Sequence, residues 1–306
     1  MVSSRRHDAP PLTPADDQAL PVMRAAYSDR TAALMARFCE LAYVPFPVDM
    51  DETAPGGGQT FAPESLGALL APGGFRVLHR FAWENVQGFL AIRPGVHAVL
   101  TFRGTANPAN WWTDFDLSRI PFPDYPQVKI HKGFYETFKE ARESIESALA
   151  DVPSDVRLYI TGHSLGGALA QIASAVLARD NLAACYTFGS PRVANKRFDI
   201  YVKCPHYRVI NHWDIVPGIP LASPWGYQHG GDPRLLRGKR PNAVLRDDYP
   251  AALRFIVDFA GFVPAVIQSK TGIFNDHAIA NYRRQLDHIA AVRGHARKPQ
   301  EPPPAP

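Results

Sequence analysis

The stretch that decides the fold is LYITGHSLGGA, at residues 158–168. Its first four residues are apolar or β-branched and suit a buried strand, whereas the apolar run that begins at Gly166 suits a helix. Ser164 therefore lies at a sharp turn from strand into helix. Only residues without a Cβ atom fit two positions away on either side, where Gly162 and Gly166 stand. Such a turn holds the serine hydroxyl out at the end of the sheet, beside the free N–H groups of a helix N-terminus, which is a suitable place for a nucleophile.

Strands and helices alternate in the chain on both sides of this turn. The order strand, helix, strand, helix predicts parallel strands joined by right-handed crossovers, and hence an α/β domain. In such a sheet the functional side chains lie at the carboxyl ends of the strands. The expected strands are 75–81, 86–93, 97–104, 157–162, 184–189 and 207–212, and the expected helices are 27–42, 134–150, 165–178, one near 194–202, and 251–266.

The composition is that of a globular protein with a sizeable core. Of its 306 residues 46% are hydrophobic and 20% are charged. Residues 1–20 and 291–306 are rich in proline, and we expect both to be disordered. Residues 21–290 contain no internal repeat and no convincing linker, so we expect them to form one domain.

Several classes of protein are excluded by charge and residue usage. The net charge is only +4, and the basic runs at 234–240 and 293–298 lack interleaved aromatic residues, so we expect no nucleic-acid partner. The three cysteines are too few for a disulfide framework and have no metal-ligand spacing, so no metal site is expected.

The apolar segments of the sequence indicate where in the cell the protein is expected. The apolar stretch 255–267 contains Asp258 and Pro264 and is too short to span a bilayer. The first twenty residues lack the apolar run of a signal peptide. We therefore expect a cytoplasmic protein without an integral membrane segment. The alternative is export by a leader or route that is not visible in the sequence.

A serine nucleophile needs a base, and the base needs a third group to orient it. Asp214 closely follows the expected strand 207–212, so it lies at the same edge of the sheet as Ser164. Among the histidines beyond Asp214, His277 stands in a loop that leads into a helix and can reach back to the sheet, and His229 is the alternative. His163 adjoins Ser164 in the chain, but alternation along a strand should point it elsewhere, as a packing residue.

Acyl transfer also needs donors for the oxyanion that develops in the transition state. The N–H group of Leu165, at the start of the helix after the serine, is one candidate. Thr105 follows the strand that ends at Gly104, and both its N–H group and its hydroxyl could point inward.

Eight sequence blocks carry a resemblance to a known family. TFRGT, NWWTD, HKGF, GHSLGGALA, TFGSPRVAN, YRVINHWDIVP, GYQHGG and DHAIANY follow one another in unbroken order within roughly residues 75–285. Together they resemble the class 3, fungal-type triacylglycerol lipases. The resemblance implies an α/β-hydrolase fold with a predominantly parallel sheet flanked by helices, and no cofactor. It also implies a triad of Ser164, Asp214 and His277, with Thr105 and Leu165 as the oxyanion hole.

The resemblance further implies that a short helical lid follows Thr105. The lid would carry Trp111, Trp112 and Phe115 and would meet a lipid–water interface when it opens, while Asp114 would brace the hydroxyl of Thr105.

The expected function is therefore a serine hydrolase that acts on lipid esters through an acyl-enzyme. Phospholipase A1 or feruloyl-type esterase activity on the same triad is an alternative. A catalytically inactive binding protein of the same fold is another, which is disfavoured because every catalytic position holds a competent residue.

Overall fold

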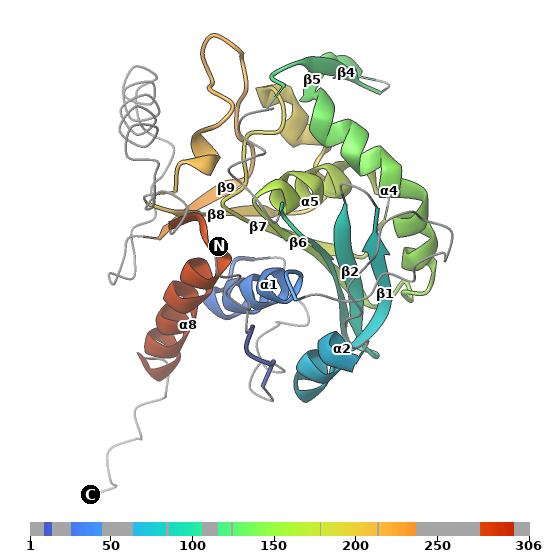
Figure 1. Cartoon of the computed structure of the whole chain (residues 1–306), viewed down its shortest axis with the longest axis vertical. Coiled ribbons are helices and arrows are strands. Elements are labelled where there is room, and N and C mark those ends of the chain that lie inside the picture. Colours follow the sequence, from blue (N-terminus) through green and yellow to red (C-terminus); the bar gives the residue numbers. More distant parts are fainter. Residues whose placement is uncertain are drawn as a thin grey trace, which may run out of the picture.

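The computed structural model describes residues 9–13, 26–44, 64–83, 86–105, 116–123, 125–177, 179–212, 214–236 and 276–296. A seven-stranded sheet in the order β1-β2-β3-β6-β7-β8-β9 runs through the centre of this part of the chain (Figure 1). Its strands are β1 (Arg76–Ala82), β2 (Gln87–Arg93), β3 (His97–Phe102), β6 (Arg157–His163), β7 (Leu182–Phe188), β8 (His206–Asn211) and β9 (Asp232–Leu236).

The sheet changes from antiparallel to parallel at β3. Strands β1, β2 and β3 pair antiparallel, and β6, β7, β8 and β9 then follow β3 in parallel. The carboxyl ends of these five strands meet at one edge, because Phe102 at the end of β3 pairs with Gly162 near the end of β6. The segments that follow β3, β6 and β8 are therefore neighbours in space.

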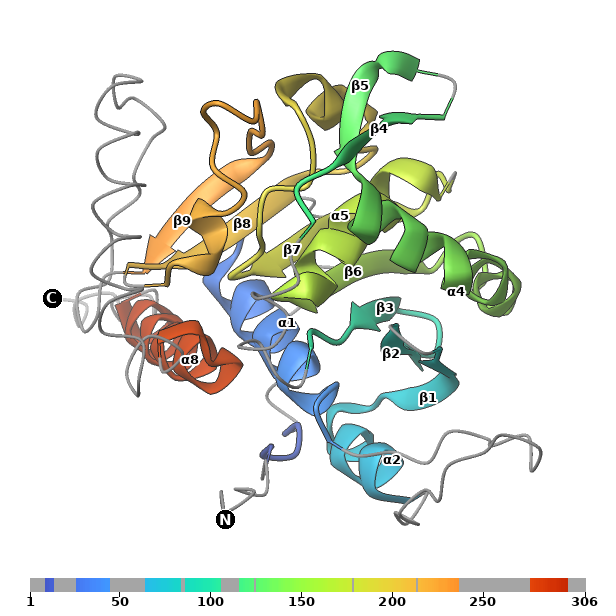
Figure 2. The same ribbon diagram turned by 45° about the horizontal axis from the view of Figure 1, so that its top comes forward.

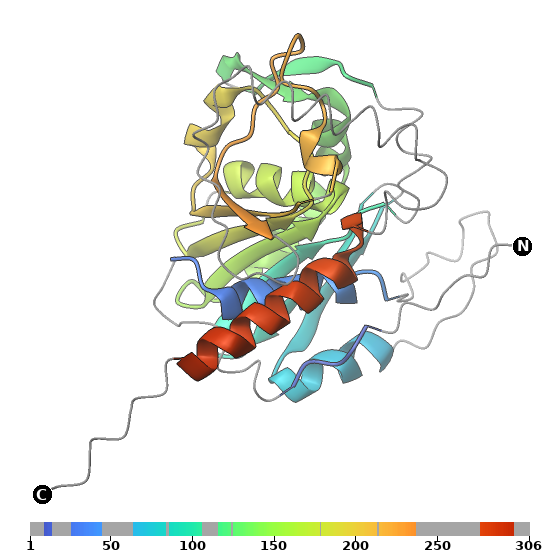
Figure 3. The same ribbon diagram turned by 90° about the vertical axis from the view of Figure 1, so that its left-hand side faces the viewer.

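Helices cover both faces of the sheet (Figures 2 and 3). One face carries α4 (Lys132–Ala150) and α5 (Leu165–Val176), and the other carries α1 (Asp29–Leu41) and α8 (Ile279–Ala296). Strands β3 and β7 are buried along their whole length, as expected for a sheet that is covered on both sides. The remaining elements are α2 (Glu64–Leu70), the hairpin of β4 (Arg119–Phe122) and β5 (Tyr125–His131), and the 3₁₀ turns η2 (Ala71–Gly73), η3 (Lys196–Tyr201) and η4 (Val216–Gly218).

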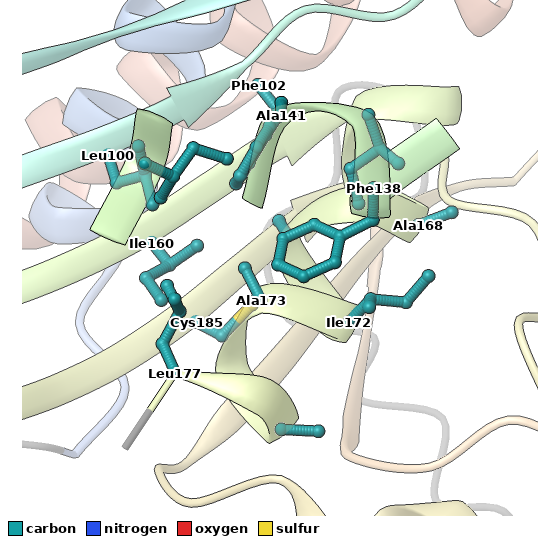
Figure 4. Packing of buried hydrophobic residues seen from close by; sticks show 14 of the residues in the cluster. Leu100, Phe102, Phe138, Ala141, Ile160, Ala168, Ile172, Ala173, Leu177 and Cys185 are labelled. Carbon is teal, nitrogen blue, oxygen red and sulfur yellow. The ribbon is translucent and has the colours of Figure 1, made fainter. Parts of the chain in front are cut away.

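Alternation along the strands divides the core between these two faces. On β3, Leu100 and Phe102 pack on the face of α4 and α5, in one cluster with Phe138 and Ile172 (Figure 4). Val99, the residue before Leu100, packs on the opposite face with residues of α1 and α8. Helix α5 is buried from Leu165 to Ala175, which fixes the helix that begins at the serine turn.

Ion pairs join the two helices of the second face. Asp287 of α8 binds Arg37 of α1 at 3.1 Å and Arg283 of its own helix at 2.9 Å. Arg283 also binds Glu40 of α1 at 2.5 Å. Because His277 lies directly before α8, these contacts between α1 and α8 help to place it.

Most of the expected elements are present. The expected helix near 194–202 is the 3₁₀ turn η3, and α2, β9 and the β4–β5 hairpin were missed. Strand β9 reads DPRLL, and its proline is tolerated because β9 is an edge strand, where a missing N–H group costs no pairing. The expected helix 251–266 lies outside the described residues.

The expected division at residues 20 and 290 stays a prediction. Leu12 is buried and its N–H group donates to the Leu69 carbonyl at 2.9 Å, and α8 continues to Ala296. Within the described ranges, no helix combines the length and apolar character needed to cross a bilayer.

Replacing Gly162 by Ala should destabilise the protein by roughly 3 kcal/mol or more. A Cβ atom at this position would lie 2.0 Å from the Gly166 carbonyl oxygen, so the strand and the helix would have to separate. Gly67→Ala is the matched control, because no atom lies within 4 Å of its added Cβ and alanine favours a helix interior by about 0.5–1 kcal/mol. Urea unfolding measures both changes, and equal stabilities of the two variants would contradict this account of the turn.

Candidate active site

The turn between β6 and α5 places Ser164 in an unusual backbone conformation. Its φ of 58° and ψ of −129° make it the one non-glycine residue with positive φ in the part of the chain that the structure describes. Such a conformation costs about 1–3 kcal/mol and persists only where the surrounding structure enforces it. Here the Ser164 N–H group donates to the Phe188 carbonyl at the end of β7, at 2.9 Å. Ser164 is thus fixed on the neighbouring strand as well as by its own.

A buried aspartate and histidine form a hydrogen-bonded pair at the same edge of the sheet. Asp214, in the loop after β8, accepts the N–H group of Val216 on Oδ1 at 2.9 Å. Its Oδ2 accepts Nδ1 of His277 at 2.8 Å, and both side chains are almost completely buried. The other ring nitrogen of His277, Nε2, is buried and has no hydrogen-bond partner among the described residues. With its proton on Nδ1, the ring has a lone pair on Nε2 that can accept another.

The pair and the serine converge on the end of β7. Gly189 directly follows Phe188, the residue that binds the Ser164 N–H group. A Cβ atom on Gly189 would lie 2.6 Å from Asp214 Oδ2 and 3.0 Å from His277 Nδ1. The pair therefore packs against the residue next to the one that fixes the serine. The alternative histidine has a different partner, because Nε2 of His229 donates to the Pro217 carbonyl at 2.6 Å.

Two backbone segments adjoin Ser164, and they carry the two expected oxyanion donors. Leu165 is the first residue of α5, so its N–H group has no acceptor within the helix. The segment after β3 passes so close that a Cβ on Gly104 would lie 2.9 Å from the Cβ of Ser164, and Thr105 is the next residue. The expected lid residues Trp111, Trp112 and Phe115, and the expected brace Asp114, lie outside the described residues.

Sequence reasoning missed Tyr282, which completes the surroundings of Asp214. The side chain is wholly buried in α8, its hydroxyl donates to Asp214 Oδ2 at 2.5 Å, and it accepts the N–H group of Asn211 at 3.0 Å. Burial, followed by the neighbouring Asp214, raises the pKa of Tyr282 well above its ordinary value, so the hydroxyl remains a donor. The tyrosine lies five residues after His277, but nothing in that spacing reveals the contact.

His163 contacts the histidine of the pair instead of serving as simple packing. Its ring lies 4.6 Å from that of His277 between centroids, and its Nε2 binds the His277 carbonyl oxygen at 2.7 Å. His163 points toward the face of α1 and α8, where it contacts Tyr43 and Tyr282. His277 approaches the sheet from this same face, because it leads into α8.

Comparison with known proteins identifies the family. Residues 99–223 match the family described as lipase (class 3). This match supports the expected resemblance to the class 3 lipase family over this part of the chain. The chain is 32% identical over 158 residues to a lipase of Rhizomucor miehei, covering 47% of this chain and 43% of that lipase. It is 35% identical over 138 residues to the secreted mono- and diacylglycerol lipase 1 of Fusarium solani, covering 43% of this chain and 41% of the relative. It thus spans less than half the length of these curated relatives.

The solved structures agree with the class 3 lipase assignment. A triacylglycerol lipase whose catalytic centre is formed by a serine protease triad superposes with a TM-score of 0.51 at 26% identity. The match covers 55% of this chain and 69% of that lipase. The expected α/β-hydrolase fold is confirmed by this likeness and by the largely parallel sheet with helices on both faces.

Tyr282→Phe should lower kcat for a soluble ester about tenfold and leave KM nearly unchanged. The ring remains, but Asp214 loses one of its donors, and a hydrogen bond to a charged group contributes about 1.5–3 kcal/mol. Steady-state kinetics on p-nitrophenyl butyrate measures the effect. The matched control is Tyr125→Phe, on β5 and 40% exposed, which should leave kcat unchanged. Equal kcat in the two variants would contradict a role for the Tyr282 hydroxyl.

Proposed function

We propose that the protein is a serine hydrolase that cleaves carboxylic esters of lipids through an acyl-enzyme. The observation that carries the proposal is the buried Asp214–His277 pair, whose Nε2 has no hydrogen-bond partner among the described residues, at the same strand end that binds a serine held at positive φ. The match of residues 99–223 to the class 3 lipase family and the likeness to a lipase with a serine protease triad support it.

In the proposed mechanism Ser164 Oγ attacks the ester carbonyl while His277 Nε2 takes the hydroxyl proton. Asp214 holds the imidazole with its Nδ1 proton in place and stabilises the imidazolium that forms. The tetrahedral intermediate places its negative oxygen near the N–H groups of Leu165 and Thr105, and one such donor contributes about 3–4 kcal/mol. His277 then gives the proton to the departing alcohol, and water hydrolyses the acyl-enzyme by the same steps in reverse order. Protein groups and water carry every step.

The substrate class rests on the relatives. The Fusarium solani relative is named for mono- and diacylglycerols and a structural neighbour for triacylglycerol, so acylglycerols are the proposed substrates. The segment after Thr105, with Trp111, Trp112 and Phe115, is proposed as a lid over the site, with Asp114 as the brace of Thr105. The same relative is named a secreted enzyme, which favours export over the cytoplasm.

Ser164→Ala and His277→Ala should each lower the rate of p-nitrophenyl ester hydrolysis to about a thousandth of the native rate or less. The first change removes the nucleophile and the second removes its base. Ser164→Ala should also abolish covalent labelling by a fluorophosphonate. Rates are measured over acyl chains from acetate to palmitate and on tributyrin and phosphatidylcholine emulsions, which also separates lipase from phospholipase activity.

Matched controls come from the same neighbourhood. Ser174→Ala removes a buried serine of α5 whose hydroxyl donates to the Ala170 carbonyl, and His229→Ala removes the alternative histidine. Both variants should retain labelling and turnover. Labelling that survives in Ser164→Ala, or an enzyme silenced by His229→Ala but not by His277→Ala, would contradict the assigned roles. A native protein that neither labels nor turns over any ester would favour the binding-protein alternative.

A further inference from the structure

Two side chains outside the expected triad join the N-terminal helix to the backbone of His277. Tyr43, two residues beyond the end of α1, places its hydroxyl 2.8 Å from Nδ1 of His163. Nε2 of His163 lies 2.7 Å from the carbonyl oxygen of His277. The three residues thus form a continuous chain of hydrogen bonds.

The direction of each hydrogen bond in this chain follows from the partners. A carbonyl oxygen only accepts, so Nε2 of His163 must carry a proton and donate to His277. The ring is buried, and burial, followed by the neighbouring His277, lowers its pKa well below the ordinary value, so the imidazole is neutral. A neutral ring with its proton on Nε2 accepts at Nδ1, so the Tyr43 hydroxyl must donate.

Tyr43 is fixed by the segment that borders Ser164. A Cβ atom on Gly104 would lie 2.4 Å from the Tyr43 hydroxyl oxygen, so the tyrosine fits tightly against the strand end that leads to Thr105. The guanidinium carbon of Arg103 also lies 5.4 Å from the centroid of the Tyr43 ring, within the range of a cation–π contact. The donor at the far end of the chain is therefore in a defined position.

The backbone of His277 is held from two strand ends. Asn211, the last residue of β8, donates its Nδ2 to the Asp276 carbonyl at 2.8 Å. His163, the last residue of β6, donates to the next carbonyl, that of His277. The His277 ring keeps its contact with Asp214 only if these two consecutive peptide groups stay in place.

We propose that Tyr43 and His163 are positioning residues, which fix the backbone of His277 so that its ring meets Asp214 on one side and Ser164 on the other. The inference rests on the proposed function, since it assigns these residues to the placement of the proposed base. Neither residue touches the ester in this account. A displacement of about 1 Å at a reacting group can lower a rate about a hundredfold, so loss of the chain should act on kcat.

Three variants test the proposal by steady-state kinetics on p-nitrophenyl butyrate. Tyr43→Phe removes only the hydroxyl and should lower kcat about three- to tenfold with KM unchanged. His163→Leu removes the donor to His277 and should lower kcat about thirty- to a hundredfold. His163→Gln supplies an N–H donor at about the position of Nε2 and should recover most of that loss. Tyr125→Phe and His79→Leu are the controls, in an exposed tyrosine of β5 and a partly exposed histidine of β1 that pairs with Asp151.

Hydrogen–deuterium exchange over residues 276–283 measures the stability of this backbone and does not depend on turnover. All variants are compared well below their melting temperatures. Faster exchange in Tyr43→Phe and His163→Leu, restored in His163→Gln together with kcat, is the expected result. Native-like exchange in both Tyr43→Phe and His163→Leu would overturn the proposal, and so would faster exchange with an unchanged kcat. Equal losses of kcat in His163→Gln and His163→Leu would overturn it as well. A native protein without esterase activity would contradict the proposed function itself, and the exchange rates would still decide whether the two residues hold His277.

Discussion

The backbone turn at Ser164 is the constraint on which the rest of the site depends. A positive φ at a residue with a side chain is unfavourable by itself, so packing on all sides must hold it. Strand β6 is paired on both edges, by β3 and β7, and α5 is buried in the core from its first residue onward. The turn therefore cannot relax without separating a central strand from the helix that it leads into. The fold uses its core to hold one serine in position.

The second constraint is the burial of the Asp214 carboxylate. A carboxylate that is removed from water must accept hydrogen bonds from the protein instead. The loop after β8 supplies one donor, the Val216 N–H group. The other two are the ring of His277, just before α8, and the hydroxyl of Tyr282, within α8. Helix α8 is joined in turn to α1 by the ion pairs of Arg37 and Arg283. Packing on the face of the sheet opposite α5 thus determines where the proposed base stands.

Sequence reasoning found what depends on local pattern and chain order. Ser164 followed from a strand, two glycines and a helix, and Asp214 from its place after a strand, so both could be placed at one edge of the sheet. Tyr282 and Tyr43 could not be found in this way. Their contacts with Asp214 and His163 span 68 and 120 residues and depend on how α8 and α1 pack across the sheet. Strand β9 was missed because it begins with Asp and Pro, which are typical of turns as well as of an edge strand.

These constraints lead to the proposal that a strained turn and a buried acid–base pair place Ser164 Oγ, His277 Nε2 and the N–H groups of Leu165 and Thr105 around a single ester carbonyl. A crystal structure of the adduct formed with a p-nitrophenyl alkylphosphonate tests it most directly. The predicted result is a phosphorus atom bonded to Ser164 Oγ, with its phosphoryl oxygen accepting both N–H groups and its ester oxygen facing His277 Nε2. Phosphorus on any other side chain, or a phosphoryl oxygen turned away from Leu165 and Thr105, would contradict the claim.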